Sequence, residues 1–381
     1  MNRKYQIIWT LLRPVVTAFI RLKFGYTFEK AENLPENYIV LSNHVTDFDP
    51  LFVAASFPRQ MFFVASEHIA RWKFIYPILK FLLAPIIRYK GTVATSTVVE
   101  VLRKIRKGGN VAIFAEGIRT WDGVTSPILP STAKLVQSAK CGLVTYKLTG
   151  GYFVSPNWSE GGTRRGPIHG APVNIYTREQ LAAMSVEEIY GIITRDLHED
   201  AYARQLADPK PYRGRQIACK MENLLFICPE CGGHDVFCSE GDRVTCKNCG
   251  MEFTYDEYGM LHGAPFRTVK EFADWQKKKV AEDAAKGIVY ASPTATLSTL
   301  DKHIETFADQ GELTMSGELL KCGSTEIPLA DIAEIAIHGR HGLVFTVNRK
   351  YYALVPDKAS NAYRFVLYFN AWKNKTLEKV G

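Results

Sequence analysis

The chain reads YIVLSNHVTDFDP from Tyr38 to Pro50, and this stretch decides the fold class. Its first four residues, Tyr38 to Leu41, form a short apolar run that predicts a buried strand. The pair Asp49-Pro50 predicts the start of a helix, because proline favours the first helical position and aspartate can cap it. A strand that leads through a short loop into a helix is the building unit of an α/β domain.

The same alternation continues along the chain. Residues 61–65 are strand-like, residues 95–107 have helical spacing and end at two glycines, and residues 111–114 are again strand-like. The sequence therefore predicts an α/β domain with a mixed sheet flanked by helices. This domain is expected to end near residue 215, because residues 208–215 are a polar stretch rich in proline and glycine, as linkers are.

Two polar residues follow the first strand, His44 and Asp49. Five residues of helix would turn their side chains about 140° apart, so they can meet only if His44 lies in the loop and Asp49 at the helix start. A carboxylate bound to one ring nitrogen would then orient the imidazole and leave the other nitrogen to take a proton. The pattern makes His44 a candidate general base. Asp47 is an alternative source of the carboxylate.

A second polar group follows the strand at residues 111–114, where the chain continues Glu116-Gly117-Ile118-Arg119-Thr120. Ligands bind at the carboxyl ends of strands in α/β sheets, glycine lets backbone approach a ligand, and arginine suits phosphate. Arg88, at the end of another apolar run, is a further candidate phosphate contact. The structural alternatives are a surface ion pair between Glu116 and Arg119, and an isolated surface arginine at position 88.

The order Asn43-His44-x4-Asp49, Arg88 and Glu116-Gly117-Ile118-Arg119-Thr120 resembles the glycerolipid acyltransferase family, typified by 1-acyl-glycerol-3-phosphate acyltransferases. The resemblance covers about residues 30–180. It implies that His44 and Asp49 are a catalytic dyad and that the acceptor is bound by four residues: Arg88, Glu116, Gly117 and Arg119. The usual Glu-Gly-Thr-Arg-Ser of the family has Ile118 and Thr120 here, and the later Val-Pro-Val-like segment is Leu143 to Lys147.

The resemblance implies an enzyme that transfers a fatty acyl group from an acyl thioester to the free hydroxyl of 1-acyl-glycerol-3-phosphate, giving phosphatidic acid. The donor would be acyl-CoA or acyl carrier protein. The alternatives are another glycerolipid acceptor, or a non-catalytic lipid- or protein-binding scaffold. The aromatic stretch from Trp72 to Leu83 is expected to line an acyl-chain tunnel, to lie at the membrane or to pack in the core.

The chain has a net charge of +8, and residues 1–30 contribute much of its positive excess. In this segment basic residues alternate with apolar ones. This segment is too charged to span a bilayer, and its composition suits a helix that lies in the membrane interface. The alternative is a helix that packs on the main domain. Pro14 is expected to kink or split this helix. Without a secretory signal or a spanning segment, we expect a cytoplasmic protein, peripheral on the cytoplasmic face of the membrane. The basic residues are Arg3, Lys4, Arg13, Arg21, Lys23 and Lys30.

Two C-x-x-C pairs predict a zinc ribbon at residues 216–262, in which four thiolates hold a structural Zn²⁺. Redox chemistry at a single C-x-x-C pair is the alternative. The neighbouring His234 and Cys238 are expected not to be ligands. Acidic residues are frequent in this segment, so no nucleic-acid partner is expected. The four predicted ligands are Cys228, Cys231, Cys246 and Cys249.

The rest of the chain predicts a linker helix at residues 263–290 and a β-rich domain at 291–381 that ends in a helix. Strands followed by one helix are similar to a pleckstrin-homology-like fold. Strands are expected at residues 312–320, 326–337, 342–347 and 351–355, and the final helix at 361–373. The predicted domains are thus residues 1–30, 31–215, 216–262, 263–290 and 291–381.

Overall fold

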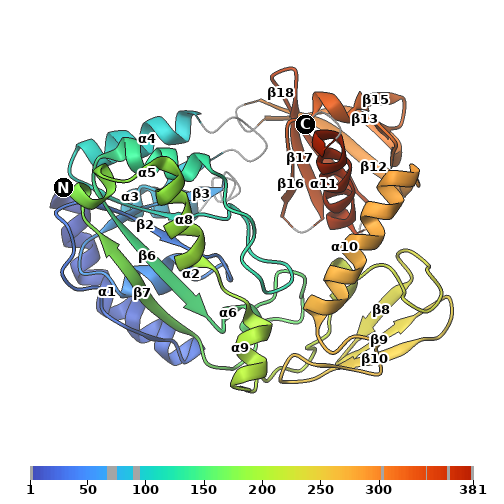
Figure 1. Ribbon diagram of the computed structural model, residues 1–381, viewed down its shortest axis with the longest axis horizontal. Coiled ribbons are helices and arrows are strands. Elements are labelled where there is room, and N and C mark those ends of the chain that lie inside the picture. Colours follow the sequence, from blue (N-terminus) through green and yellow to red (C-terminus); the bar gives the residue numbers. More distant parts are fainter. Residues whose placement is uncertain are drawn as a thin grey trace. The chain divides into compact units, whose positions relative to one another are not determined.

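The computed structural model describes residues 3–66, 75–88, 95–301, 304–339, 341–357 and 361–378 (Figure 1). The chain divides into two compact units. Of the described residues, the N-terminal unit comprises 3–66, 75–88, 95–217 and 257–259, and the C-terminal unit comprises 218–256, 260–301, 304–339, 341–357 and 361–378. Trp72 to Phe74, part of the predicted tunnel or membrane stretch, lie outside the described residues.

A seven-stranded mixed sheet forms the middle of the N-terminal unit, in the order β1-β7-β6-β2-β5-β3-β4. The central strand β2 is parallel to both of its neighbours, β5 and β6, and Ser42 at its end lies beside Phe114 at the end of β5. The two polar motifs therefore start from adjacent strand ends. The strands are β1 (Thr27–Phe28), β2 (Tyr38–Ser42), β3 (Met61–Ser66), β4 (Ile86–Arg88), β5 (Asn110–Phe114), β6 (Gly142–Thr149) and β7 (His169–Tyr176).

Helices cover both faces of this sheet (Figure 1). Alternate residues of β2 point to opposite faces, so Ile39 and Leu41 join the core beneath α4, α5 and α8, whereas Tyr38 packs on Phe57 after α2. The α/β prediction is confirmed. The helices are α1 (Arg3–Phe24), α2 (Asp49–Ala55), α3 (Ile75–Leu83), α4 (Thr95–Arg106), α5 (Ser131–Ala139), α6 (Gly151–Val154), α7 (Arg178–Ala182), α8 (Val186–Leu197) and α9 (Ala201–Ala207).

Helix α1 runs through Pro14 as one element, so Pro14 does not split it, whereas the kink stays a prediction. Proline removes one backbone donor from a helix, but two side chains that precede Pro14 fasten α1 to the region around α2. Trp9 donates its indole N–H to the carbonyl of Phe57 at 3.2 Å, and Arg13 Nε donates to that of Ala55 at 3.2 Å. Among the described residues, no helix combines the length and the apolarity needed to span a bilayer.

The cysteine-rich part of the C-terminal unit is a four-stranded antiparallel sheet in the order β11-β10-β9-β8. A turn at Gly241 and Asp242 joins its first two strands. Helix α10 (Val269–Lys286) follows, with Thr268 and Glu271 forming a capping box at its start. The strands are β8 (Phe237–Glu240), β9 (Arg243–Cys246), β10 (Glu252–Tyr255) and β11 (Leu261–His262).

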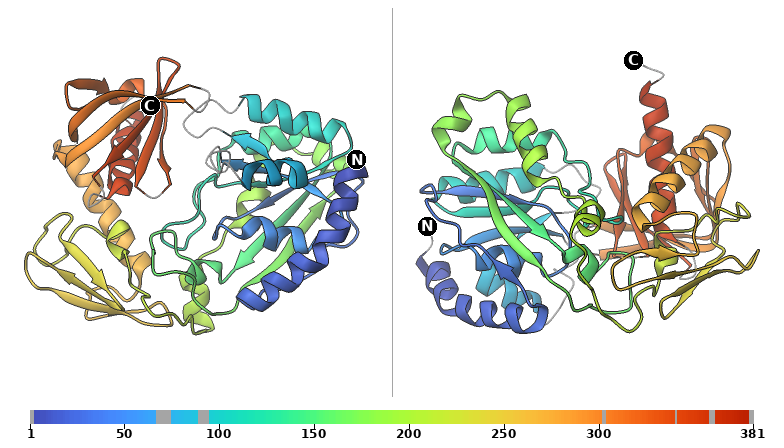
Figure 2. Two further views of the ribbon diagram at one scale, coloured as in Figure 1. Left: turned by 180° about the vertical axis from the view of Figure 1, so that it is seen from behind. Right: turned by 60° about the horizontal axis from the view of Figure 1, so that its bottom comes forward.

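A second seven-stranded sheet, entirely antiparallel, completes this unit in the order β15-β14-β13-β12-β18-β17-β16, together with helix α11 (Ala362–Glu378) (Figure 2). The predicted strand at 326–337 is wrong, because a 3₁₀ turn at Leu329–Asp331 divides it. The predicted strand at 312–320 turns at Gly317, whose φ is +52°. The strands are β12 (Tyr290–Asp301), β13 (Ile304–Ser316), β14 (Leu319–Cys322), β15 (Thr325–Pro328), β16 (Ile335–His338), β17 (Gly342–Val347) and β18 (Lys350–Pro356).

Candidate active site

The loop between β2 and α2 folds around the carboxylate of Asp49, which is fully buried. Asp49 accepts the backbone N–H of Val45 at 2.6 Å, that of Thr46 at 2.9 Å and the hydroxyl of Thr46 at 2.6 Å. The helix begins at Asp49 as predicted, but its cap residue is Phe48. The aspartate side chain is used to close the loop instead of capping the helix.

His44 lies beside this carboxylate, with Nδ1 at 2.8 Å from Asp49 Oδ2. Its ring stacks on Phe114 with 4.4 Å between ring centres, and its side chain is 20% exposed. A neutral imidazole whose Nδ1 faces a carboxylate carries its proton on Nδ1, so Nε2 is the nitrogen that can accept one. The alternative partner, Asp47, instead directs Oδ2 to within 3.3 Å of Arg119 Nη1.

Glu116 connects the two motif loops. Its Oε1 accepts the backbone N–H of His44 at 2.7 Å, and its Oε2 accepts that of Ser126 at 2.6 Å. Burial raises the pKa of Glu116 to about 8, an effect that these two hydrogen bonds oppose. Glu116 thus fixes the backbone on both sides of the site, and its bonds differ from those of the surface ion pair considered as its structural alternative.

Arg119 is buried, with 7% of its side chain exposed, and a residue from a distant loop holds it in place. Nη2 donates to Asn157 Oδ1 at 2.6 Å, and Asn157 Nδ2 donates to the Arg119 carbonyl at 3.3 Å. Sequence reasoning missed Asn157. It lies beyond the motifs, and nothing in its local pattern distinguishes it from an ordinary loop asparagine.

Arg88 and Gly117 lie close together. A Cβ atom at Gly117 would be 3.6 Å from Arg88 Nη1, and the φ of Gly117 is +69°, which disfavours any other residue. Arg88 Nε is buried and has no hydrogen-bond partner within the described part of the chain. A guanidinium in this condition is suited to an anionic ligand, because a buried donor without a partner is costly.

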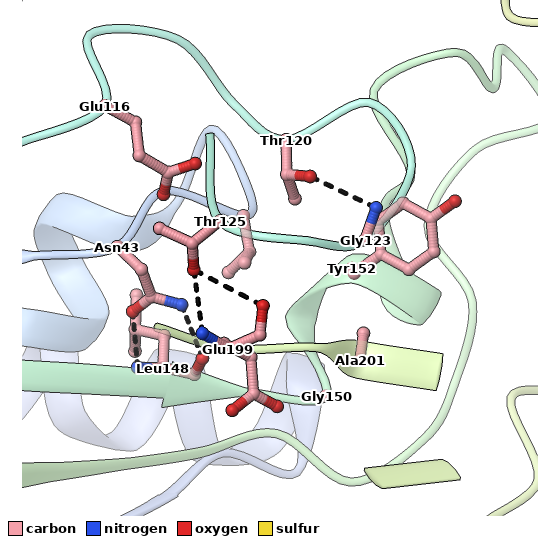
Figure 3. A pocket seen from close by; sticks show the side chains of 11 residues that line it. Asn43, Glu116, Thr120, Gly123, Thr125, Leu148, Gly150, Tyr152, Glu199 and Ala201 are labelled. Carbon is pink, nitrogen blue, oxygen red and sulfur yellow. Dashed lines mark hydrogen bonds between the residues drawn. The ribbon is translucent and has the colours of Figure 1, made fainter. Parts of the chain in front are cut away.

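Thr120 matches the last position of the second motif, but its hydroxyl serves a turn. It donates to the carbonyl of Val124 at 2.6 Å and accepts the N–H of Gly123 at 3.1 Å. A small cavity lies beneath these loops, with room for about one water molecule (Figure 3). Its lining includes Asn43, Glu116, Thr125 and Glu199.

The four predicted cysteine ligands gather at one place, with all Sγ atoms within 4.8 Å of one another. Sγ of Cys228 lies 3.7 Å from that of Cys249, and Sγ of Cys231 lies 3.9 Å from that of Cys246. Zinc–sulfur bonds of about 2.3 Å in a tetrahedron place the sulfurs about 3.8 Å apart, so the cluster has the right dimensions for Zn²⁺. The amide of Asn248, which donates to Cys231 Sγ, lowers the pKa of that thiol to about 6.

His234 and Cys238 are not part of this cluster, which contains only the four predicted ligands in the described part of the chain. His234 Nε2 is 3.5 Å from Asp283, and Cys238 donates its S–H to the carbonyl of Thr245 at 3.6 Å. Both residues therefore have other partners.

Comparison with known proteins bears on the N-terminal unit. Residues 25–149 match the family model described as Acyltransferase. No curated protein sequence matches the chain. The crystal structure of the 1-acyl-sn-glycerophosphate (LPA) acyltransferase PlsC from Thermotoga maritima is similar, with 18% identity and a TM-score of 0.44 over 55% of this chain and 84% of that chain. The N-terminal PH domain of human ARAP2 gives 16% identity and a TM-score of 0.19 over 24% of this chain and 84% of that chain.

The matched segment starts just after α1 and ends at the last residue of β6, so it contains β2, β5 and both polar motifs. The match confirms the acyltransferase resemblance found in the sequence. The pleckstrin-homology-like fold of the C-terminal strands stays a prediction. Residues 25–149 are therefore identified as an acyltransferase domain.

Proposed function

We propose that the protein transfers a fatty acyl group from an acyl thioester to the free hydroxyl of 1-acyl-glycerol-3-phosphate, which gives phosphatidic acid. The observation that carries this proposal is the His44–Asp49 pair inside the acyltransferase domain, at 2.8 Å and partly open to solvent. In this arrangement His44 is the general base and Asp49 orients it.

The reaction needs no covalent enzyme intermediate. Nε2 of His44 takes the proton of the acceptor hydroxyl while the oxygen bonds to the thioester carbonyl carbon. The tetrahedral intermediate then collapses, the carbon–sulfur bond breaks, and the thiolate takes the proton back from the imidazolium. Asp49 stabilises the imidazolium while it carries that proton, and its own position is fixed by the bonds from Val45 and Thr46.

The phosphate of the acceptor is assigned to Arg88 and Arg119. Arg88 has a buried Nε without a protein partner in the described residues, and Gly117 leaves space beside its guanidinium. Arg119 is oriented by Asn157. Two cations near the general base favour an acceptor that carries a phosphate close to its hydroxyl. Acyl-CoA and acyl carrier protein present the same thioester, so both are candidate donors.

The test is an acyl-transfer assay with both donors and with lysophosphatidic acid, other lysophospholipids and monoacylglycerol as acceptors. We expect His44→Ala to lose at least about a hundredfold in kcat, the usual contribution of a general base. Arg119→Ala should mainly raise the KM for the phosphorylated acceptor. His198→Ala, at an exposed position after α8, is the control and should keep full activity.

A folded His44→Ala protein with full activity would refute the proposed function. Equal use of lysophosphatidic acid and monoacylglycerol by the wild type would instead assign another glycerolipid acceptor. A folded wild type that binds lipid but transfers no acyl group from either donor would favour the scaffold alternative.

Helix α1 is proposed to bind the membrane interface, on the cytoplasmic side. Its exposed large apolar residues are three or four positions apart and therefore lie on one face. Trp9, Ile20 and Phe24 are buried on the other face. The exposed residues are Ile7 (53% exposed), Leu11 (71%), Val15 (66%), Phe19 (43%) and Leu22 (88%).

The cysteine cluster is proposed to hold a structural Zn²⁺, because its four sulfurs fill a tetrahedral site and leave no position for a substrate. The metal would supply folding energy to a small sheet of four short strands.

A further inference from the structure

The loop that carries the candidate dyad also carries an acidic side chain that the proposed mechanism does not use, that of Asp47. Hydrogen bonds from Val45 and Thr46 to Asp49, and from the Phe48 N–H to the Thr46 hydroxyl at 3.0 Å, hold the loop on both sides of Asp47. The Asp47 side chain is 73% exposed, so the rigid loop presents it at the surface of the site.

Asp47 faces the cation that is assigned to the acceptor phosphate. Its Oδ2 lies 3.3 Å from Arg119 Nη1, whereas Arg119 Nη2 is bound to Asn157 Oδ1 at 2.6 Å. The two contacts differ in kind, because Asn157 is buried and grips the arginine through both its side-chain amide and the Arg119 carbonyl. Asn157 is thus a fixed support, whereas the Asp47 carboxylate can rotate into solvent.

We propose that Asp47 determines the specificity for the acceptor. Its carboxylate pairs with the Arg119 guanidinium until the phosphate of the acceptor displaces it. The inference rests on the proposed function, because it takes Arg119 as a phosphate contact. Asp47 acts as an internal competitor. A dianionic phosphate monoester displaces it readily, whereas a neutral acceptor gains nothing from Arg119 and a monoanionic diester gains less.

The ion pair has one buried and one exposed partner, so its strength is near that of a surface pair. Removing the charge of Asp47 should therefore lower the KM for lysophosphatidic acid by about two- to fivefold. The inhibition constant of inorganic phosphate, used as the probe of the same site, should fall by a similar factor. The KM for monoacylglycerol should not change, because that acceptor has no anion to place on Arg119.

The experiment measures kcat and KM for both acceptors, and inhibition by inorganic phosphate, in Asp47→Asn, Arg119→Ala and the double variant. Glu32→Gln is the matched control, because it removes the same charge from an exposed residue of the same unit that precedes β2. We expect the effect of Asp47→Asn to vanish in the Arg119→Ala background.

An unchanged KM for lysophosphatidic acid in Asp47→Asn would overturn the proposal, and so would an equal change in Glu32→Gln or an effect that persists without Arg119. These results are separable from a failure of the proposed function. If the proposed function is wrong, the His44→Ala variant stays active. If only the Asp47 proposal is wrong, the His44→Ala variant is inactive, and the Asp47 variants alone depart from the expected kinetics.

Discussion

The carboxylate of Asp49 binds the histidine ring, two backbone N–H groups and one hydroxyl, although it is fully buried. Several donors around one buried charge are what a carboxylate needs to stay ionised without water. Among them, only the Thr46 hydroxyl and the His44 ring belong to side chains. The hydroxyl is therefore the contact through which a substitution can weaken the orientation of Asp49 without touching the proposed base.

Thr46→Val should lower kcat by about tenfold, because it removes a 2.6 Å hydrogen bond to a charged group and leaves the shape of the side chain intact. The KM for lysophosphatidic acid should change little, since Thr46 is not among the acceptor contacts. Thr46→Ser keeps the hydroxyl and should retain most of the activity. Steady-state kinetics of the three proteins check this, and equal loss in the serine and valine variants would contradict it.

Glu116 predicts a dependence of stability on pH. Its pKa is about 8 in the folded protein and about 4.5 when unfolded, so the fold prefers the protonated form. The resulting stabilisation is complete below pH 4.5 and is lost as the pH rises through about 8. The free energy of unfolding should therefore fall by up to about 1.4 kcal/mol per pH unit within this window.

Urea unfolding at pH 5.5 and 7.5 tests this prediction, with Glu116→Gln as the comparison that does not titrate. At pH 7.5 the free energy of unfolding of the wild type should be lower, relative to that of the variant, than it is at pH 5.5. A difference that is constant across the two pH values would show that the two backbone hydrogen bonds outweigh burial.

The sequence identified His44, Asp49, Glu116 and Arg119 as site candidates, because motif residues near strand ends are visible in a linear pattern. The bonds that hold them were not visible. Glu116 was expected to touch the acceptor, but its carboxylate binds the backbone of His44 and Ser126. Asn157 comes from 38 residues beyond Arg119, and such a contact depends on tertiary packing alone.

At the scale of elements, α1 shows why both sequence interpretations of the N-terminal segment were reasonable. One face packs on the domain and the other is apolar and exposed. Deleting the helix would remove the buried Trp9 and Phe24 and uncover Phe52, on which Phe24 packs. Point substitutions on the exposed face are therefore the sharper test of membrane binding.

Leu11→Asp and Leu22→Asp should each reduce binding to anionic lipid vesicles by about tenfold or more, because each removes an apolar side chain that would be buried in the interface. Vesicle flotation measures the bound fraction. Val99→Asp, at an exposed apolar position of α4 (60% exposed), is the matched control and should bind as the wild type does. If all three variants lose vesicle binding equally, or if all three bind as the wild type does, α1 is not the binding element.

Strand β12 shows where the sequence was insufficient at this scale. It lies between β13 and β18 in the middle of the second sheet, but it was not predicted as a strand. Its buried residues include Ser292, Ala295 and Ser298, which are small or polar and give no apolar alternation. Strand β12 nevertheless forms because it pairs with β13 on one side and with β18 on the other. These tertiary contacts override the weak local signal for a strand.

At the scale of the whole molecule, the cysteine cluster is coupled to the rest of the C-terminal unit. Asp235, which follows the first cysteine pair, forms an ion pair with the buried Arg364 of α11. Asn361, before the same helix, donates to the carbonyl of Glu222 at 3.0 Å. Loss of the metal should therefore loosen α11 as well as the ribbon.

Removing zinc with a chelator, or the substitution Cys231→Ser, should lower the thermal midpoint of the C-terminal unit and expose it to proteolysis. The acyltransferase domain should keep its own transition. Calorimetry, limited proteolysis and elemental analysis, with one metal expected per wild-type chain, check this. Cys238→Ser is the control, since its sulfur is outside the cluster. A metal-free wild type with an unchanged midpoint would contradict the proposed zinc site.

The buried face of α1 has a consequence for how the molecule would meet a lipid surface. Many interfacial helices are random coil in water and form only on contact with lipid, which opposes binding through lost chain entropy. Here tertiary contacts through Trp9 and Arg13 already fix the helix in the lipid-free protein. Adding vesicles should then leave the far-ultraviolet circular dichroism spectrum unaltered, and the adsorption should be fast and reversible.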